Sequence, residues 1–195
     1  MTDKTTLDVY GERVDEYVSV PVTGTQAEAL AGFLEKLPPQ SHILDLGCGP
    51  GLHAAEMMEA GHRVSAIDAT PEFVSAAKAL GVDARLGRFD DVTEQAAYDA
   101  VWASFSLLHA PRTEFPRHVA AVHRALRPGG VLFLGMKLGQ GEERDALGRF
   151  YSYYSEEELR ERLAQAGFTA IEAVHGTGKG LAGTDDPYIL MTAYA

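Results

Sequence analysis

The sequence has little of several features that define whole classes of protein. Its single cysteine, Cys48, cannot form an intrachain disulfide, and it excludes a metal site built from several thiolates. A reducing, cytoplasmic setting is the simplest interpretation, and we expect no metal. The sequence contains no run of about 18 apolar residues, so we expect no membrane-spanning helix. Residues 1–4 also lack the basic and then apolar pattern of a signal peptide.

Basic residues are scarce as well. The sequence has 17 Lys and Arg against 28 Asp and Glu, which gives a formal net charge of −11. Because phosphate backbones are bound by surplus Lys and Arg, nucleic acid is not the expected partner. The length of 195 residues predicts a single domain, with N-terminal helices over 1–40 forming a lid or cap and a core over 41–195. The sequence does not indicate an oligomeric state.

A glycine-rich stretch over residues 43–51 organises the chain. Apolar residues continue to Leu46, and glycine then stands at every second position, at Gly47, Gly49 and Gly51. This pattern predicts a buried strand, a tight turn and the first turn of a helix. Glycine permits a positive φ and lets a ligand touch the backbone. The free N–H groups of the following helix favour an electronegative group.

Strands and helices alternate after this stretch. The expected strands lie at 43–46, 63–67, 83–86, 98–103, 131–136, 168–174 and 188–194. Helices are expected after the first, second, fourth and fifth of these strands, whereas no helix separates the last two, which we expect to pair antiparallel. This order predicts an α/β fold with a doubly wound, mostly parallel seven-stranded sheet, one antiparallel C-terminal strand and helices on both faces. Ligands of such sheets bind at the carboxyl ends of the strands.

Two segments outside this alternation also carry expectations. Helical spacing of apolar residues from Leu7 to Tyr17 predicts one short amphipathic helix, which Pro21 and Gly24 end. Tyr10 and Tyr17 share one face of this helix, where they either close over a ligand or simply pack against the domain. The polar, glycine-containing segment 137–149 is expected to be a mobile loop.

The glycine pattern discriminates between nucleotide ligands. A dinucleotide fingerprint starting at Gly47 requires glycine at position 52, where the sequence has Leu52. A nicotinamide-dependent oxidoreductase is therefore the less favoured alternative. Asp68 ends the second strand about 20 residues further on, where a carboxylate can accept hydrogen bonds from both hydroxyls of a ribose. The alternative role of Asp68 is to cap the helix that begins near Pro71.

Four motifs in this order resemble those of the class I S-adenosylmethionine-dependent methyltransferases. They are D-L-G-C-G-P-G, A-I-D, Y-D-A-V-W-A-S-F-S-L-L-H and L-R-P-G-G-V-L-F. The chain resembles their small bacterial members called methyltransferase domain 11 or 25, strongly over residues 40–137 and more weakly beyond them. The resemblance implies a Rossmann-like methyltransferase fold, S-adenosyl-L-methionine as cofactor and methyl transfer to an acceptor, which we expect to be a small molecule.

The resemblance also implies a cofactor site at the ends of the first four strands. Its residues are Asp45, Gly47, Cys48, Gly49, Asp68, Ala69, Phe89, Ala103 and Ser104. Asp45 would hold the methionine amino group, directly or through water, and Asp68 the ribose hydroxyls. The family usually carries an acidic residue near the adenine amino group, but this sequence has Arg88 there, with Asp90 two residues later. Phe89 is therefore the candidate for the adenine contact.

Methyl transfer requires few catalytic side chains. Methyl transfer is an in-line displacement from a sulfonium, so alignment supplies much of the acceleration, and a base is needed only if the acceptor must lose a proton. His109 is a candidate base or a histidine that fixes a turn, and Tyr17 and Tyr153 are weaker catalytic candidates. Arg149, Tyr151, Tyr153 and Tyr154 either border the acceptor or are ordinary surface or core residues. A binding protein that senses the cofactor without transfer remains an alternative.

Overall fold

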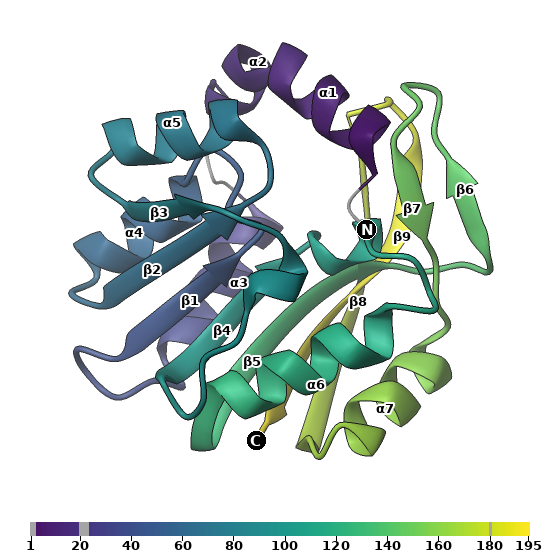
Figure 1. Cartoon of the computed structure of the whole chain (residues 1–195). Helices are drawn as coiled ribbons and strands as arrows, with labels where there is room; N and C mark the ends of the chain where they lie inside the picture. Colours follow the sequence, from purple (N-terminus) through teal and green to yellow (C-terminus); the bar gives the residue numbers. More distant parts are fainter. Residues whose placement is uncertain (1–2, 20–23, 180) are drawn as a thin grey trace.

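The computed structural model describes residues 3–19, 24–179 and 181–195. Within these residues seven strands form one sheet, in which β9 runs antiparallel to both neighbours and the other six strands are parallel (Figure 1). In spatial order they are β3 (Asp83–Leu86), β2 (Arg63–Asp68), β1 (His42–Leu46), β4 (Tyr98–Ser104), β5 (Leu126–Lys137), β9 (Asp185–Tyr194) and β8 (Thr169–Lys179). The predicted fold class is confirmed, and the two C-terminal strands are longer than predicted.

Helices cover both faces of this sheet. One face carries α3 (Thr25–Leu34), α4 (Leu52–Glu59) and α5 (Pro71–Ala79), and the other carries α6 (Phe115–Ala125) and α7 (Glu156–Gln165). Alternate residues of a strand point to opposite faces, so Ile43 packs with Phe33 of α3 while Leu44 joins the core that contains Leu163 of α7. Burial on both faces explains the nearly continuous apolar runs of the central strands.

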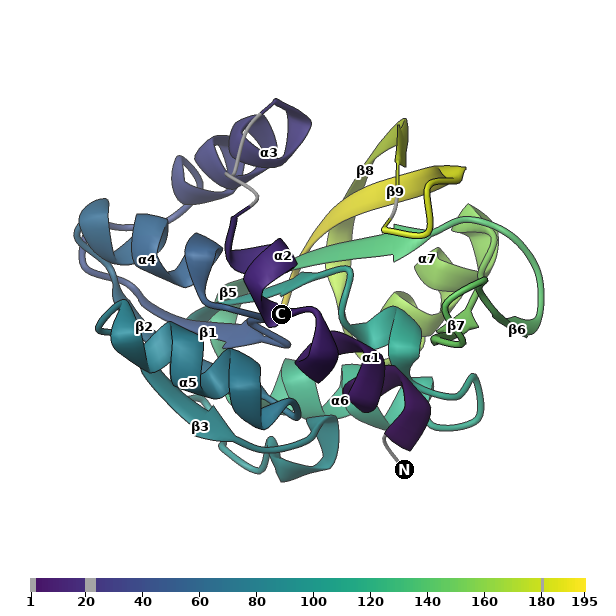
Figure 2. The same ribbon diagram turned by 90° about the horizontal axis from the view of Figure 1, so that it is seen from above.

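Two N-terminal helices, α1 (Lys4–Glu12) and α2 (Val14–Val18), lie across the carboxyl edge of the strands (Figures 1 and 2). The prediction of one continuous helix is wrong, because Arg13 leaves the helical region at φ −119° and ψ 19°. Asp3 caps α1 by accepting a hydrogen bond from the backbone N–H of Thr6. Pro21, one of the two residues predicted to end the helix, lies outside the described residues. A lid over 1–40 stays a prediction.

The prediction of a mobile loop over 137–149 is also wrong. This segment contains β6 (Glu142–Arg144), which pairs antiparallel with β7 (Phe150–Ser152). Arg149 precedes β7, is only 2% exposed, and forms an ion pair with Asp145. Gly148 lies in the turn between the two strands, which this buried ion pair anchors, whereas Gly139 and Gly141 lie in the bend before β6. None of the described helices combines the length and apolar character needed to cross a membrane.

Candidate functional site

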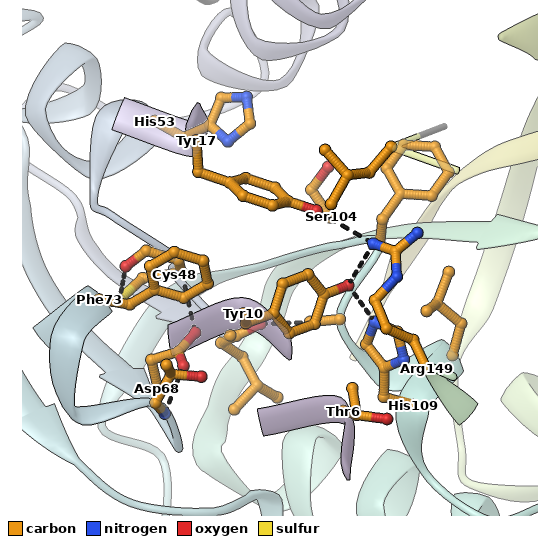
Figure 3. Close-up of a pocket in the computed structure, with 18 of the residues that line it drawn as sticks. Thr6, Tyr10, Tyr17, Cys48, His53, Asp68, Phe73, Ser104, His109 and Arg149 are labelled. Atoms are coloured by element: carbon orange, nitrogen blue, oxygen red, sulfur yellow. Dashed lines mark hydrogen bonds between the residues drawn. The ribbon is translucent and has the colours of Figure 1, made fainter. Parts of the chain in front are cut away.

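A cavity of about 720 Å³ lies below α1 and α2 at the carboxyl ends of β1, β2 and β4. This volume is within the range of roughly 300–1,000 Å³ that small-molecule sites occupy. We call its two sides the Asp68 end, formed by Gly47, Cys48, Gly49 and Asp68, and the Arg149 end, formed by Tyr10, Tyr17, His109, Arg149 and Tyr151. Figure 3 shows Asp68 and Arg149 on opposite sides, with the ring of Tyr10 between them.

The three glycines of the loop after β1 all have a positive φ, at 76°, 54° and 86°, but for different reasons. A Cβ on Gly47 would come within 2.3 Å of the Ser106 Cβ, and one on Gly51 within 2.7 Å of the Ala77 Cβ. These two positions require glycine for packing within the protein. A Cβ on Gly49 would meet nothing within 4 Å. Gly49 therefore leaves open space on the cavity wall, where a ligand can approach the backbone.

Asp68 is held in one orientation by the neighbouring backbone. Its Oδ2 accepts the N–H of Gly49 at 2.9 Å, and its Oδ1 accepts that of Thr70 at 2.8 Å. Each carboxylate oxygen can still accept a further hydrogen bond, so two acceptors remain for a diol. Burial raises the pKa of Asp68, while the N–H groups of Thr70 and Gly49 oppose the rise. The bond to Thr70 also orders the turn before α5, so the two roles weighed from the sequence are compatible.

Asp45 stands behind the loop and is not one of the residues that line the cavity. It is 2% exposed, and its Oδ2 has no hydrogen-bond partner among the described residues. Burial raises the pKa of Asp45 to about 8, and the negative charge of Asp68 adds to the rise. The Nε1 of Trp102 and the Nε2 of His53, which do belong to lining residues, are likewise buried without a partner in the described chain. Burying such atoms costs free energy unless a polar ligand or a water molecule forms hydrogen bonds with them.

The other residues of the predicted cofactor site divide into two groups. Ala69, Phe89 and Ser104 line the cavity, whereas Ala103 is fully buried in the sheet and does not. Cys48 lines the cavity beside the loop. Burial raises the pKa of the Cys48 thiol, as do the nearby carboxylates of Asp45 and Asp68. The sulfur therefore stays protonated at neutral pH and has no activating neighbour of the kind that a nucleophilic cysteine needs.

The segment after β3 places its charged residues in different directions. Arg88 lines the cavity together with Phe89. Asp90 instead lies against α6, where its Oδ1 is 2.8 Å from the Arg117 guanidinium and 3.6 Å from the His118 ring. Asp90 therefore does not take the place of the acidic residue that the family pattern expects. Phe89 stays the candidate for a contact with a base.

Arg149 is the centre of the opposite end of the cavity. Its Nε and Nη2 donate to the Asp145 carboxylate at 2.9 and 2.6 Å. Its Nη1 donates to the hydroxyls of Tyr10 at 3.2 Å and Tyr17 at 3.1 Å. A second link to the N-terminal helices is the backbone N–H of Phe150, which donates to Thr6 Oγ1 at 2.8 Å. The hairpin and the N-terminal helices thus close the cavity together.

His109 belongs to the short helix η2 (Leu107–His109) and lies beside Arg149 in the cavity wall. Its Nδ1 is 2.6 Å from the carbonyl oxygen of Phe150, and its Nε2 is 2.7 Å from the Tyr10 hydroxyl. Burial lowers the pKa of His109 to about 4, Arg149 lowers it further, and the Phe150 carbonyl opposes the fall. The histidine therefore fixes the local structure and also presents a neutral ring at the cavity.

The remaining aromatic candidates lie in different places. Tyr151 lines the cavity, but Tyr153 does not, and Tyr154 is buried in the core against Phe115.

Sequence reasoning missed two features of the Arg149 end: the anchoring role of Asp145, and the contact between Tyr10 and His109. The four-residue spacing of Asp145 and Arg149 was the available signal for the first. Within the described residues, no group of three or more His, Cys, Asp or Glu side chains is placed to hold a metal ion.

Comparisons with known proteins agree with this geometry. Residues 43–130 match the family model described as "Methyltransferase domain". The ubiquinone biosynthesis O-methyltransferase of Xanthomonas oryzae is 36% identical over 102 residues, which are 48% of this chain and 42% of that protein. The corresponding Xylella fastidiosa protein is 33% identical over 112 residues, 52% of this chain and 45% of that protein. The chain thus spans less than half the length of these curated relatives.

A solved structure covers nearly the whole chain. It is the Burkholderia thailandensis 1,6-didemethyltoxoflavin-N1-methyltransferase with bound 1,6-didemethyltoxoflavin and S-adenosylhomocysteine. It is 26% identical, has a TM-score of 0.77, and is matched over 96% of this chain and 84% of its own. A Haloferax volcanii putative methyltransferase, at 17% identity and a TM-score of 0.78, shares the fold. The order of strands, the glycine loop and these similarities show that the chain has the fold of the class I S-adenosylmethionine-dependent methyltransferases, and that residues 43–130 match a methyltransferase domain.

Proposed function

We propose that this protein transfers the methyl group of S-adenosylmethionine to a small molecule bound in the same cavity. The observation that carries the proposal is the continuity of the cavity. It joins a glycine loop and an oriented carboxylate, at the Asp68 end, to a polar and aromatic Arg149 end. One cavity with two chemically different ends suits a donor and an acceptor that must react in line.

The Asp68 end fits S-adenosylmethionine in three respects. Asp68 keeps two acceptor positions for the ribose hydroxyls, and Gly49 leaves space for the ligand against the loop. Asp45 has an unpaired buried oxygen, which an ammonium group would satisfy. When bound, the cofactor supplies a methyl group on a positively charged sulfonium. The chain contributes by orienting the two reactants and by excluding water beneath α1 and α2.

The names of the relatives support a small-molecule acceptor. The curated relatives are ubiquinone biosynthesis O-methyltransferases, and the similar solved structure holds 1,6-didemethyltoxoflavin. The aromatic lining of the Arg149 end, with Tyr10, Tyr17 and Tyr151, also suits a compact organic acceptor. A cytoplasmic setting stays a prediction from the single cysteine.

The cofactor is tested by calorimetry with S-adenosylmethionine, S-adenosylhomocysteine and NAD. We expect micromolar-range binding of the first two and none of NAD. Asp68→Ala should weaken S-adenosylhomocysteine binding by about 1–3 kcal/mol because charged hydrogen bonds are lost. Asp83→Ala is the matched control, since Asp83 is exposed and does not line the cavity. Tight binding of NAD, or unchanged affinity in Asp68→Ala, would contradict the proposed site.

Turnover separates the enzyme from a sensor that only binds the cofactor. Labelled S-adenosylmethionine is incubated with the protein and a mixture of small metabolites, and transfer of the label is followed. We expect a labelled product and release of S-adenosylhomocysteine. Tight cofactor binding with no labelled product from any mixture would favour the sensor.

A further inference from the structure

We propose that Tyr10 and His109 form a proton-accepting pair at the Arg149 end, and that the acceptor carries an aromatic or enolic hydroxyl group. Tyr10 would face the acceptor, and His109 would act through Tyr10. The inference rests on the proposed function, since it assigns the chemistry of the acceptor side of the same cavity.

The hydrogen-bond partners of His109 determine which of its nitrogen atoms carries a proton and which one accepts from Tyr10. The Phe150 carbonyl oxygen can only accept, so Nδ1 of His109, at 2.6 Å, carries the proton. The buried ring is neutral, because its pKa lies near 4, and Nε2 is therefore a free acceptor. The Tyr10 hydroxyl, at 2.7 Å from Nε2, consequently donates to His109. The imidazole is thus already set to receive the Tyr10 proton.

The oxygen of Tyr10 is polarised from its other side. Nη1 of Arg149 donates to it at 3.2 Å, and the guanidinium lies 5.3 Å from the centre of the Tyr10 ring. Donation of its proton to the imidazole makes the phenolic oxygen a better proton acceptor, and the cation on its other side makes the Tyr10 proton easier to release to His109. Figure 3 shows the Tyr10 hydroxyl between the Arg149 and His109 side chains at the edge of the cavity.

The proton transfer can be written as one balanced step. The acceptor oxygen forms a bond to the methyl carbon while the sulfur–carbon bond breaks, and that electron pair stays on sulfur. The acceptor O–H bond breaks, its electron pair stays on the acceptor oxygen, and its proton moves to the Tyr10 oxygen. The Tyr10 proton moves to Nε2 of His109. The products are a methyl ether, a neutral thioether and an imidazolium whose Nδ1–H bonds the Phe150 carbonyl.

The basicity of His109 matches this step. An aromatic hydroxyl has a pKa of about 10, and its acidity rises greatly as the oxygen gains a third bond. A base with a pKa near 4 lies between these two states and takes the proton as the bond to carbon forms. An aliphatic amine that is already neutral remains stable as an ammonium after methylation, so no proton must leave it during the attack. Around the ring, Arg149 and Lys137 disfavour the imidazolium, and Asp145 favours it.

The walls near the pair are suited to a planar acceptor. The ring of Tyr10 lies 5.4 Å from that of Tyr17 and 5.7 Å from that of Phe73, and the ring of Tyr151 lies 4.7 Å from that of His109. All five side chains line the cavity. They come from five separate elements, which are α1, α2, α5, η2 and β7. Aromatic walls stack favourably on aromatic ligands and exclude water from the reacting atoms.

The test starts with calorimetry of S-adenosylhomocysteine on the whole protein. A panel of phenols and catechols, together with aliphatic amines and thiols, is then incubated with S-adenosylmethionine, and released S-adenosylhomocysteine is measured. We expect turnover with members of the hydroxyl group. Tyr10→Phe and His109→Gln should each lower kcat roughly 100-fold or more with S-adenosylhomocysteine affinity unchanged. Tyr98→Phe and His123→Gln are matched controls outside the cavity lining, and they should keep wild-type kcat.

A nitrophenol acceptor that is already ionised at the assay pH separates proton transfer from a structural role. It has no proton to lose, so Tyr10→Phe should lose little kcat with it while losing kcat strongly with a neutral phenol. Equal losses with both acceptors would overturn the pair. Turnover of amines or thiols alone, or of nothing in the panel by a protein that binds S-adenosylhomocysteine, would overturn the acceptor class. Failure to bind S-adenosylhomocysteine would instead refute the proposed function.

Discussion

Cofactor affinity should depend on the ionisation of Asp45. Burial raises the pKa of this carboxyl to about 8 in the free protein, and its Oδ2 has no partner among the described residues. In the proposed site the ammonium group of the bound cofactor would favour the carboxylate, so the pKa of Asp45 would fall on binding. Binding then requires the ionised form and releases a proton. Affinity is therefore highest above pH 8 and is lost as the pH falls.

The size of the effect follows from the ionised fraction. With a pKa of about 8, Asp45 is ionised in roughly one-tenth of free molecules at pH 7 and one-hundredth at pH 6. Apparent affinity equals the intrinsic affinity multiplied by the competent fraction. Binding should therefore weaken about tenfold from the high-pH limit to pH 7, and about tenfold again to pH 6, until the lower pKa of the complex is reached.

The assay is calorimetry of S-adenosylhomocysteine from pH 6 to pH 9 on the wild type and on Asp45→Asn. The amino group of the ligand titrates equally with both proteins, so the ratio of their affinities isolates Asp45. We expect the wild-type affinity, divided by the affinity of the variant, to decrease as the pH is lowered from 9 to 6. Methylthioadenosine, which lacks the amino-acid portion, is the control and should show no such change. A ratio that is constant across this range would refute the role of Asp45.

Three further results are expected. Gly49→Val should abolish S-adenosylhomocysteine binding while the circular dichroism spectrum stays native, since the side chain enters the open space at the loop; tight binding would mean that the ligand lies elsewhere. Arg149→Met leaves Asp145 unpaired, so it should cost about 3–5 kcal/mol of unfolding free energy in urea titrations; a cost below about 1 kcal/mol would show that the pair is not an anchor. Cys48 should react slowly with iodoacetamide at pH 8, because burial raises the pKa of its thiol; rapid labelling of native protein would contradict this.

The Asp68 end of the cavity was predictable from the sequence because its residues lie at or directly after the ends of two predicted strands. The loop glycines and Asp68 follow β1 and β2 directly, and parallel strands bring their carboxyl ends to one edge. The purpose of each glycine was not predictable. Gly47 and Gly51 avoid contacts with Ser106 and Ala77, which only the packed structure brings near the loop.

Ala103 and Asp45 show that membership of a sequence motif does not predict which residues line the cavity. Both belong to sequence motifs of the family, yet neither lines the cavity. The alternation of residues along β4 turns Ala103 into the sheet while Ser104 reaches the cavity. The unpaired oxygen of Asp45 likewise depends on which polar groups the fold brings near it, and no spacing in the sequence encodes that.

The sequence by itself determined the fold class and the residues of the Asp68 end of the cavity, because strand periodicity, turn glycines and strand-end carboxylates are local patterns. Only the tertiary structure decided the Arg149 end. Tyr10 meets His109 across 99 residues of sequence and Arg149 across 139. Contacts over such distances depend on how α1 docks on the hairpin of β6 and β7. The physical reason is that local patterns specify backbone conformation and burial, whereas the partners of a buried polar side chain are set by packing.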